Sequence, residues 1–91
     1  PTPTLLNSLL PYLIVNDSRL SKTSEKTQQK VALNIFTLRE QLELSQSEVA
    51  ERAGIDRKTV NRIENERFSP SIDTLTRISV ALGVNVSDLL I

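Results

Sequence analysis

Cysteine and histidine are both absent from the 91 residues of this chain, which also has only two glycines. Without cysteine or histidine, the chain cannot form a disulfide framework, a zinc finger, a thiol nucleophile or a Ser-His catalytic triad. Two glycines are too few for a glycine-rich phosphate-binding loop, and the scattered carboxylates form no persuasive catalytic pair. We therefore expect no enzymatic activity, no cofactor and no metal site.

Long hydrophobic runs are also absent. No apolar run approaches the roughly 18 residues of a membrane-spanning helix, so we expect no membrane partner. The lack of cysteine is compatible with a reducing compartment, and we expect a cytoplasmic location.

An excess of either charge is missing as well, because 11 basic residues balance 11 acidic ones. A net charge of zero argues at first sight against a nucleic-acid partner. The charges are unevenly spread, however. Residues 1–30 carry four basic and two acidic side chains, whereas residues 31–91 carry seven basic and nine acidic. Binding depends on which face carries each charge, so the total alone does not exclude DNA.

Composition divides the chain into a segment over residues 1–29 and a domain over residues 30–91. Positions 4–15 are mostly apolar, and positions 16–29 are polar. We expect an apolar N-terminal arm, a flexible polar linker and one small domain, which is as much as this length supports. The apolar residues at helical spacing in the arm are Leu5, Leu6, Leu9, Leu10, Leu13 and Ile14.

Pro11 interrupts the arm, and a proline inside a helix costs about 3 kcal/mol. We expect either a kinked helix or a helical turn followed by an extended stretch over residues 12–15. A segment this apolar needs a surface to cover it. Leu33 and Phe36 lie off the buried stripe of the next helix, and we hypothesise that the arm covers them, within its own subunit or across a dimer. The alternative is a partly disordered arm.

Apolar residues from position 31 onward recur at helical spacing and predict five short helices without strands, an all-α fold. A capping-box pattern at Ser45 and Glu48 starts the second helix, and Gly54 ends it. Asp56 and Ser71 are expected to cap the third and fourth helices. The apolar positions assigned to the helices are Val31, Ile35, Leu38 and Leu42; Val49, Ala50 and Ala53; Val60 and Ile63; Ile72, Leu75, Ile78 and Leu82; and, after the cap Asn85, Val86, Leu89 and Leu90.

The second and third helices are joined by only three residues, so they must cross steeply. Ala50 is small where the two helices touch, and Gly54 supplies a corner with positive φ. The third helix, over residues 57–65, buries only Val60 and Ile63 and leaves a polar face outward.

The run 46–65 resembles the helix-turn-helix of the Xre/Cro-like family, the family of the lambdoid phage repressors. The resemblance covers about residues 30–91 and implies a five-helix DNA-binding domain. Glu43 stands where the family usually has glycine, so we expect either a non-glycine residue at positive φ or a different turn. The matching residues are Ala50, Gly54, Val60 and Ile63, together with Leu38-Arg39, Leu44-Ser45-Gln46, Arg62-Ile63-Glu64, Ser69-Pro70 and Ala81-Leu82-Gly83-Val84.

A helix of this kind fits the major groove of DNA, where its N-terminal residues meet base edges. Arginine and lysine side chains there can donate to guanine, and an asparagine one turn later can pair with adenine. The free amides at the start of the second helix suit a phosphate. The resemblance implies base contacts by Arg57, Lys58 and Asn61, with Arg62 at their edge, and phosphate contacts by Gln46, Thr59, Asn65 and Arg67.

Each of these residues also has a plainer interpretation. Arg57, Lys58 and Asn61 can form a solvated helix face, and Arg62 can pair with Glu66 one turn later. We expect a structural ion pair between Arg39 and Glu64 that joins the first and third helices. Gln46 can simply be the residue that begins a helix, without a contact to DNA. Glu40, Glu43, Glu48 and Glu51 are expected on the solvated face away from DNA, or less readily as a partner contact.

We therefore expect a sequence-specific, DNA-binding transcriptional regulator, a dimeric repressor of a palindromic operator. One helix in one groove reads too few base pairs for gene-level specificity, whereas a two-fold dimer reads half-sites about 34 Å apart. Besides the arm face, a second candidate interface is the C-terminal apolar group of Val84, Val86, Leu90 and Ile91. The alternative is a protein-interaction module, such as a toxin-binding antitoxin, in which DNA binding is secondary or lost. The expected partners are double-stranded DNA, a second copy and a toxin or another regulator.

Overall fold

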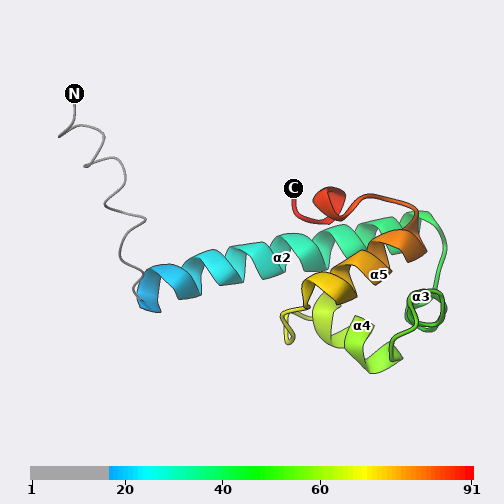
Figure 1. Cartoon of the computed structure of the whole chain (residues 1–91), viewed down its shortest axis with the longest axis horizontal. Helices are drawn as coiled ribbons and strands as arrows, with labels where there is room; N and C mark the ends of the chain where they lie inside the picture. The colour runs from blue at the N-terminus through cyan, green and yellow to red at the C-terminus, as the bar shows by residue number, and fades with distance from the viewer. Residues whose placement is uncertain (1–16) are drawn as a thin grey trace.

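A computed structural model describes residues 17–91, which fold as a small helical domain with one long projecting helix (Figure 1). The elements are α2 (Asp17–Gln41), α3 (Gln46–Ala53), α4 (Arg57–Glu64), α5 (Ile72–Leu82) and a 3-10 turn, η1 (Val86–Leu89). The expected all-α fold is confirmed. The number of helices differs, since residues 17–91 form four α-helices and the expected fifth is a 3-10 turn. The arm expected over residues 1–16 lies outside the described residues. Among the helices of residues 17–91, none has the length and apolar character needed to cross a membrane.

The first helix is much longer than the sequence suggested. Residues 17–29, which were expected to form a flexible linker, belong to α2, so that expectation is wrong. This stretch contains no glycine or proline, and lysine, glutamine and glutamate are good helix formers. Leu20 is its one apolar residue, and it is exposed. The stretch is polar because it projects away from the domain in Figure 1 and packs on no neighbouring element, not because it is a loop.

The core lies where α2, α3, α4, α5 and η1 meet. It contains most of the residues that the helical spacing assigned to it. Ser79 is the one polar residue of α5 that joins them, and its hydroxyl donates to the carbonyl of Thr76 at 2.7 Å. The buried apolar residues are Val31, Ala32, Ile35, Leu44, Val49, Ala50, Ala53, Val60, Ile63, Leu75, Ile78, Leu82 and Leu89.

Three apolar residues expected to face inward are exposed instead. Leu42 follows the end of α2, and the chain turns at Glu43 so that Leu44 is buried in its place. Ile72 opens α5 and lies off the centre of the buried stripe formed by Leu75, Ile78, Ser79 and Leu82. Leu90 comes after η1 and is also exposed, whereas Leu89 is fully buried.

Local signals set the helix boundaries. At the start of α3, the Ser45 hydroxyl accepts from the Glu48 amide, and the Glu48 carboxylate accepts from the Ser45 amide, each at 3.0 Å. The bond from the Ser45 amide holds the pKa of the Glu48 carboxyl below its usual value. Ser71 caps α5 as expected, accepting from the Thr74 amide at 3.1 Å. Asp56 stands at the N-cap position of α4, but its side chain makes no capping hydrogen bond.

The turn between α2 and α3 uses a non-glycine residue in the left-handed region. Glu43 has a φ of 57°, so the first of the two expected alternatives is confirmed. A second glutamate, Glu66, has a φ of 60° just after α4. Such a conformation costs an L-residue about 1–2 kcal/mol, and the packing on both sides of each turn must offset that cost.

The two glycines offer a matched pair of substitutions. Both lie at positive φ, but an alanine Cβ at position 54 would approach Nη1 of Arg77 to 3.2 Å, whereas one at position 83 would meet nothing within 4 Å. We expect Gly83→Ala to lower the free energy of unfolding by about 1 kcal/mol through backbone strain alone. Gly54→Ala should cost more, because Arg77 must also move away from the Ala53 carbonyl that it contacts at 3.3 Å. Equal losses in urea denaturation would contradict this account.

Candidate nucleic-acid interface

Helix α4 presents a polar face to solvent. Val60 and Ile63 are buried beneath the helix, while Arg57, Lys58 and Arg62 are exposed. Asn61 and Thr59 are half-buried at the edges of this face. The side chains that the sequence assigned to base contact are therefore free of the core, apart from the partly covered Asn61.

The α3–α4 corner that carries this face is tight. Gly54 has a φ of 69°, and its amide donates to the Glu51 carbonyl at 3.2 Å. The next amide, of Ile55, reaches back to the Ala50 carbonyl at 3.0 Å. These bonds satisfy the last carbonyls of α3, and they let α4 begin at Arg57 with its exposed side chains facing away from α2.

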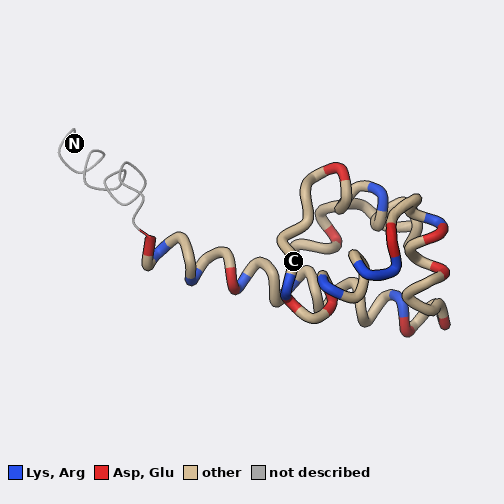
Figure 2. Tube along the Cα trace, turned by 90° about the horizontal axis from the view of Figure 1, so that it is seen from below, with Lys and Arg blue, Asp and Glu red and all other residues tan. Residues whose placement is uncertain are grey.

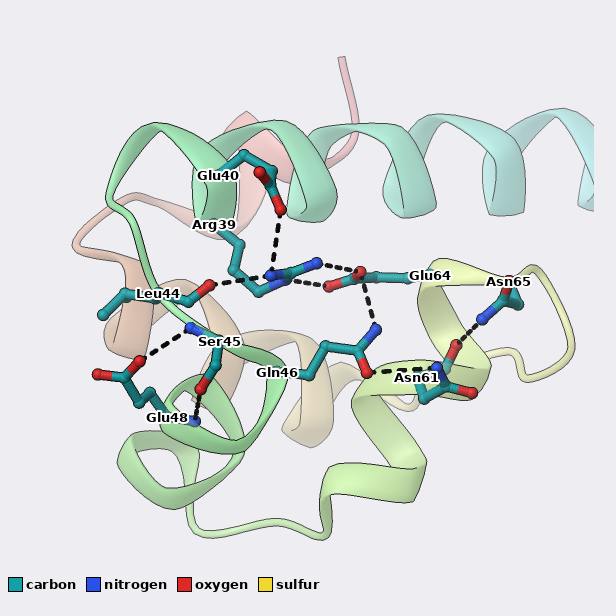
Figure 3. Close-up of polar contacts among 9 residues, drawn as sticks. All are labelled: Arg39, Glu40, Leu44, Ser45, Gln46, Glu48, Asn61, Glu64 and Asn65. Carbon is teal, nitrogen blue, oxygen red and sulfur yellow. Dashed lines mark hydrogen bonds and ion pairs between the residues drawn. The ribbon is translucent and has the colours of Figure 1, made fainter.

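An ion pair fixes α4 to the long helix (Figure 3). Nε of Arg39 donates to Glu64 Oε2 at 2.8 Å, and Nη2 donates to Glu64 Oε1 at 2.9 Å. The Arg39 and Glu64 side chains are only 10% and 5% exposed, so the pair is almost completely desolvated. The hydrogen bonds that Arg39 donates to Glu64 raise the pKa of Arg39 despite the opposing effect of burial. The expected structural ion pair between these two helices is confirmed.

The same guanidinium also fixes the entry to α3. Nη1 of Arg39 donates to the Leu44 carbonyl at 2.9 Å, and it lies 3.4 Å from Oε1 of the exposed Glu40. The Phe36 ring covers the group, with its centroid 5.3 Å from the guanidinium carbon. One side chain of α2 therefore holds both the start of α3 and the end of α4.

A chain of hydrogen bonds continues from this ion pair to the polar face. The Gln46 amide nitrogen donates to Glu64 Oε1 at 3.1 Å, and the Asn61 amide nitrogen donates to Gln46 Oε1 at 3.2 Å (Figure 3). A carboxylate can only accept hydrogen bonds, so the amide of Gln46 must turn its nitrogen toward Glu64. Its oxygen then faces Asn61, which must donate. Asn61 keeps its side-chain oxygen and one N–H for a ligand.

The sequence pattern of the helix-turn-helix family matches residues 35–89. The chain belongs to the helix-turn-helix family. The immunity repressor protein of Bacillus phage phi105 is 37% identical over 57 residues, which are 63% of this chain and 40% of the repressor. An HTH-type transcriptional regulator of Methanothermobacter thermautotrophicus is 47% identical over 45 residues, which are 50% of this chain and 65% of that protein. The helix-turn-helix chain thus spans less than two-thirds of either relative.

Solved helix-turn-helix structures share the fold. A hypothetical transcription factor from Neisseria superposes with a TM-score of 0.69 at 29% identity, over 71% of this chain and 75% of its own. The restriction-modification controller protein C.AhdI of Aeromonas hydrophila superposes with a TM-score of 0.66 at 26% sequence identity. The match covers 68% of this chain and 94% of the controller protein. A transcriptional regulator from Vibrio cholerae superposes with a TM-score of 0.70 at 26% sequence identity. The match covers 72% of this chain and 37% of that regulator. The phage repressor and the controller protein are relatives of the kind that the Xre/Cro-like resemblance implies, and that resemblance is confirmed. The family is not enzymatic.

The helix-turn-helix brings only some of the predicted contact residues together. Gln46 and Asn61 are hydrogen-bonded to each other, and one N–H of the Gln46 amide takes no part in its bonds to Glu64 and Asn61. Asn65 is exposed, and its amide donates to the Asn61 carbonyl at 2.8 Å. Arg67 is exposed in the loop beyond α4. Within residues 17–91, Arg62 makes no ion pair with Glu66, so that plainer interpretation is wrong.

The sequence did not predict the Gln46–Asn61 bond or the bond of Arg77 to the Ala53 carbonyl. The residues joined in these bonds lie 15 and 24 positions apart. Helical spacing relates residues within one helix and carries no information about such pairs. The four glutamates expected on the solvated face, Glu40, Glu43, Glu48 and Glu51, are all exposed.

The ion pair can be tested through stability. Arg39→Met leaves the Glu64 carboxylate, 5% exposed, without its cation. We expect the free energy of unfolding in urea to fall by about 3 kcal/mol, the usual cost of an uncompensated buried charge. Arg39→Met combined with Glu64→Leu should recover most of this loss, because neither charge is then buried.

Asp73→Asn is the matched control for this test. It removes the pair between Arg77 and Asp73, whose side chains are 50% and 78% exposed. Exposed pairs contribute little, so the change should stay within about 1 kcal/mol. A loss for Arg39→Met no larger than the loss for Asp73→Asn would show that the buried pair does not hold the domain together.

Proposed function

We propose that this chain is a sequence-specific DNA-binding transcriptional regulator, a dimeric repressor that acts in the cytoplasm on a palindromic operator. Residues 57–65 lie in the major groove in this proposal. The observation that carries it is the face of α4, where Arg57, Lys58 and Arg62 are exposed on a helix held rigidly by a buried ion pair. The names of the phage immunity repressor and of the HTH-type regulator support the same function.

The residues of this face have separate roles in the proposal. Arg57 and Lys58 lie in the first turn of α4, where a helix in the groove meets base edges, and each can donate to guanine. Asn61 lies one turn later with an oxygen and one N–H available, which is the pair of groups that adenine requires. Arg62 contacts a base or phosphate at the edge of the site.

Phosphate contacts position the helix without specifying sequence. We assign them to Gln46, Thr59, Asn65 and Arg67. Gln46 opens α3, where the amides of the first turn and the positive end of the helix dipole favour an anion. Its remaining N–H adds to that site while its oxygen orients Asn61.

A second candidate function is a protein-interaction module, such as a toxin-binding antitoxin. The observation that favours it is the number of large apolar side chains left exposed within residues 17–91, which include Leu33 at 64%, Ile72 at 81% and Val80 at 73%. In this reading a toxin or another regulator covers them, and DNA binding is secondary or lost.

Substitution of the α4 face tests the DNA-binding function. A duplex selected by the protein from a random-sequence pool is compared with a scrambled duplex in gel-shift titrations. Arg57→Ala and Asn61→Ala should each weaken binding to the selected duplex by about 1–3 kcal/mol, or about 5- to 150-fold, because each removes contacts to a base. Binding of the wild-type chain should also fall steeply as salt is raised, because phosphate contacts release counterions.

Arg52→Ala serves as the control, since Arg52 is an exposed arginine of α3 outside the α4 face. It should leave selectivity for the selected duplex unchanged. The proposal fails if no duplex is enriched in the selection. It also fails if Arg57→Ala and Lys58→Ala bind as the wild type does, which is the result expected of an interaction module.

A further inference from the structure

One face of α2 is exposed along the helix, and no other helix of residues 17–91 covers it. We call it the lateral face and define it by Lys26, Lys30, Leu33, Phe36 and Glu40, which are all exposed. At 3.6 residues per turn these side chains fall within about 120° around the helix. Leu33 and Phe36, at its middle, are 64% and 46% exposed.

The charges of the lateral face are ordered along the helix. Lys26 and Lys30 lie on the N-terminal side of the two apolar residues, and Glu40 lies on the C-terminal side, with Glu43 in the turn that follows. Along the projecting half of α2, drawn in Figure 2, the basic Arg19, Lys22 and Lys26 stand with the acidic Asp17 and Glu25. One acidic residue, Glu25, stands at the edge of the basic end. The face therefore runs from a basic end through an apolar middle to an acidic end. When two such faces are placed antiparallel, the basic end of one meets the acidic end of the other.

We propose that the lateral face binds the lateral face of a second copy, with the two α2 helices antiparallel. A two-fold axis between Leu33 and Phe36 brings Leu33 of each copy against Phe36 of the other. Counting outward from that axis places Lys30 of each copy close to Glu40 of the other, which lies one residue further from the axis. The same patch meets itself, as a closed two-fold dimer requires, and the opposite charges of Lys30 and Glu40 meet twice across it.

The orientation of this dimer suits one DNA duplex. When two antiparallel helices are related by a two-fold axis, that axis is perpendicular to both helices and lies in the plane of the interface between them. Arg39, which reaches α4 through Glu64, lies about 90° around α2 from the middle of the lateral face, so α4 lies along the direction of that axis. A rotation about the axis therefore leaves both α4 helices on the same side. The inference rests on the dimeric state proposed above and names the surface that forms it.

Two further contacts support the apolar middle. The Asn34 amide donates to the carbonyls of Leu89 and Ile91 at 3.0 and 2.9 Å, which ties the C-terminal residues to α2 one position after Leu33 in the sequence. Ile91 is 80% exposed, so the residue that Asn34 holds also leaves an apolar side chain uncovered within residues 17–91. On the other edge, Phe36 lies over the Arg39 guanidinium. Covering Phe36 would further exclude water from the ion pair that holds α4.

Charge reversal with mixing tests the pairing directly. In a homodimer of Lys30→Glu, the new glutamate at position 30 of each copy faces Glu40 of the other copy. In a homodimer of Glu40→Lys, Lys30 of each copy faces the new lysine at position 40 of the other copy. Each variant alone should therefore dimerise about tenfold more weakly than the wild type in sedimentation equilibrium. An equimolar mixture of the two variants restores both opposite-charge contacts in the heterodimer, and so does the double variant as a homodimer. Loss of the Arg39–Glu40 pair within one chain cannot be rescued by mixing.

Arg52→Glu and Glu51→Lys, on the exposed side of α3, are the matched reversals and should leave assembly unchanged. The proposal is overturned if the single variants dimerise like the wild type, which would mean that another surface forms the dimer. It is also overturned if neither the mixture nor the double variant regains the dimer. Binding of Lys30→Glu to a half-site duplex, followed by fluorescence anisotropy, separates the two proposals: intact binding leaves the DNA function standing whatever the assembly.

Discussion

The buried ion pair between Arg39 and Glu64 is the contact on which the arrangement of the domain depends. Its guanidinium reaches the end of α4 through Glu64 and the entry to α3 through the Leu44 carbonyl. Its carboxylate accepts from Gln46, which in turn accepts from Asn61 on the polar face. An apolar core tolerates small rotations of one helix against another, whereas a desolvated, bidentate pair has a single good geometry. The pair therefore defines how the two helices of the motif are presented.

The neutral total charge conceals a clear separation of charges. Arg57, Lys58 and Arg62 project from α4, and Arg67 follows in the next loop. The four exposed glutamates of α2, α3 and the turn between them are elsewhere on the surface. A domain with so little excess charge gains less from non-specific attraction to a phosphate backbone. Discrimination by the face of α4 then matters more to its total affinity.

Much of the fold could be predicted because its signals are local. Capping residues such as Ser45 and Ser71, and apolar side chains three or four residues apart, mark the helices and their buried sides. Prediction failed where the deciding factor was a neighbour. Residues 17–29 are helical because they continue a helix that packs further along, and Leu42 is exposed because Glu43 turns the chain. The motif located the polar face of α4, but the order of bonds from Glu64 to Asn61 requires three-dimensional placement.

The uninterrupted course of α2 has a mechanical consequence. Its 25 residues extend about 37 Å and include neither glycine nor proline, so the helix has no built-in hinge. A molecule that binds the projecting half would therefore act on one continuous helix, which carries Arg39 near its other end. A tilt of that half of α2 would rotate the exposed face of α4 with it, because the helix between them has no flexible joint. The long helix can thus work as a lever as well as a scaffold.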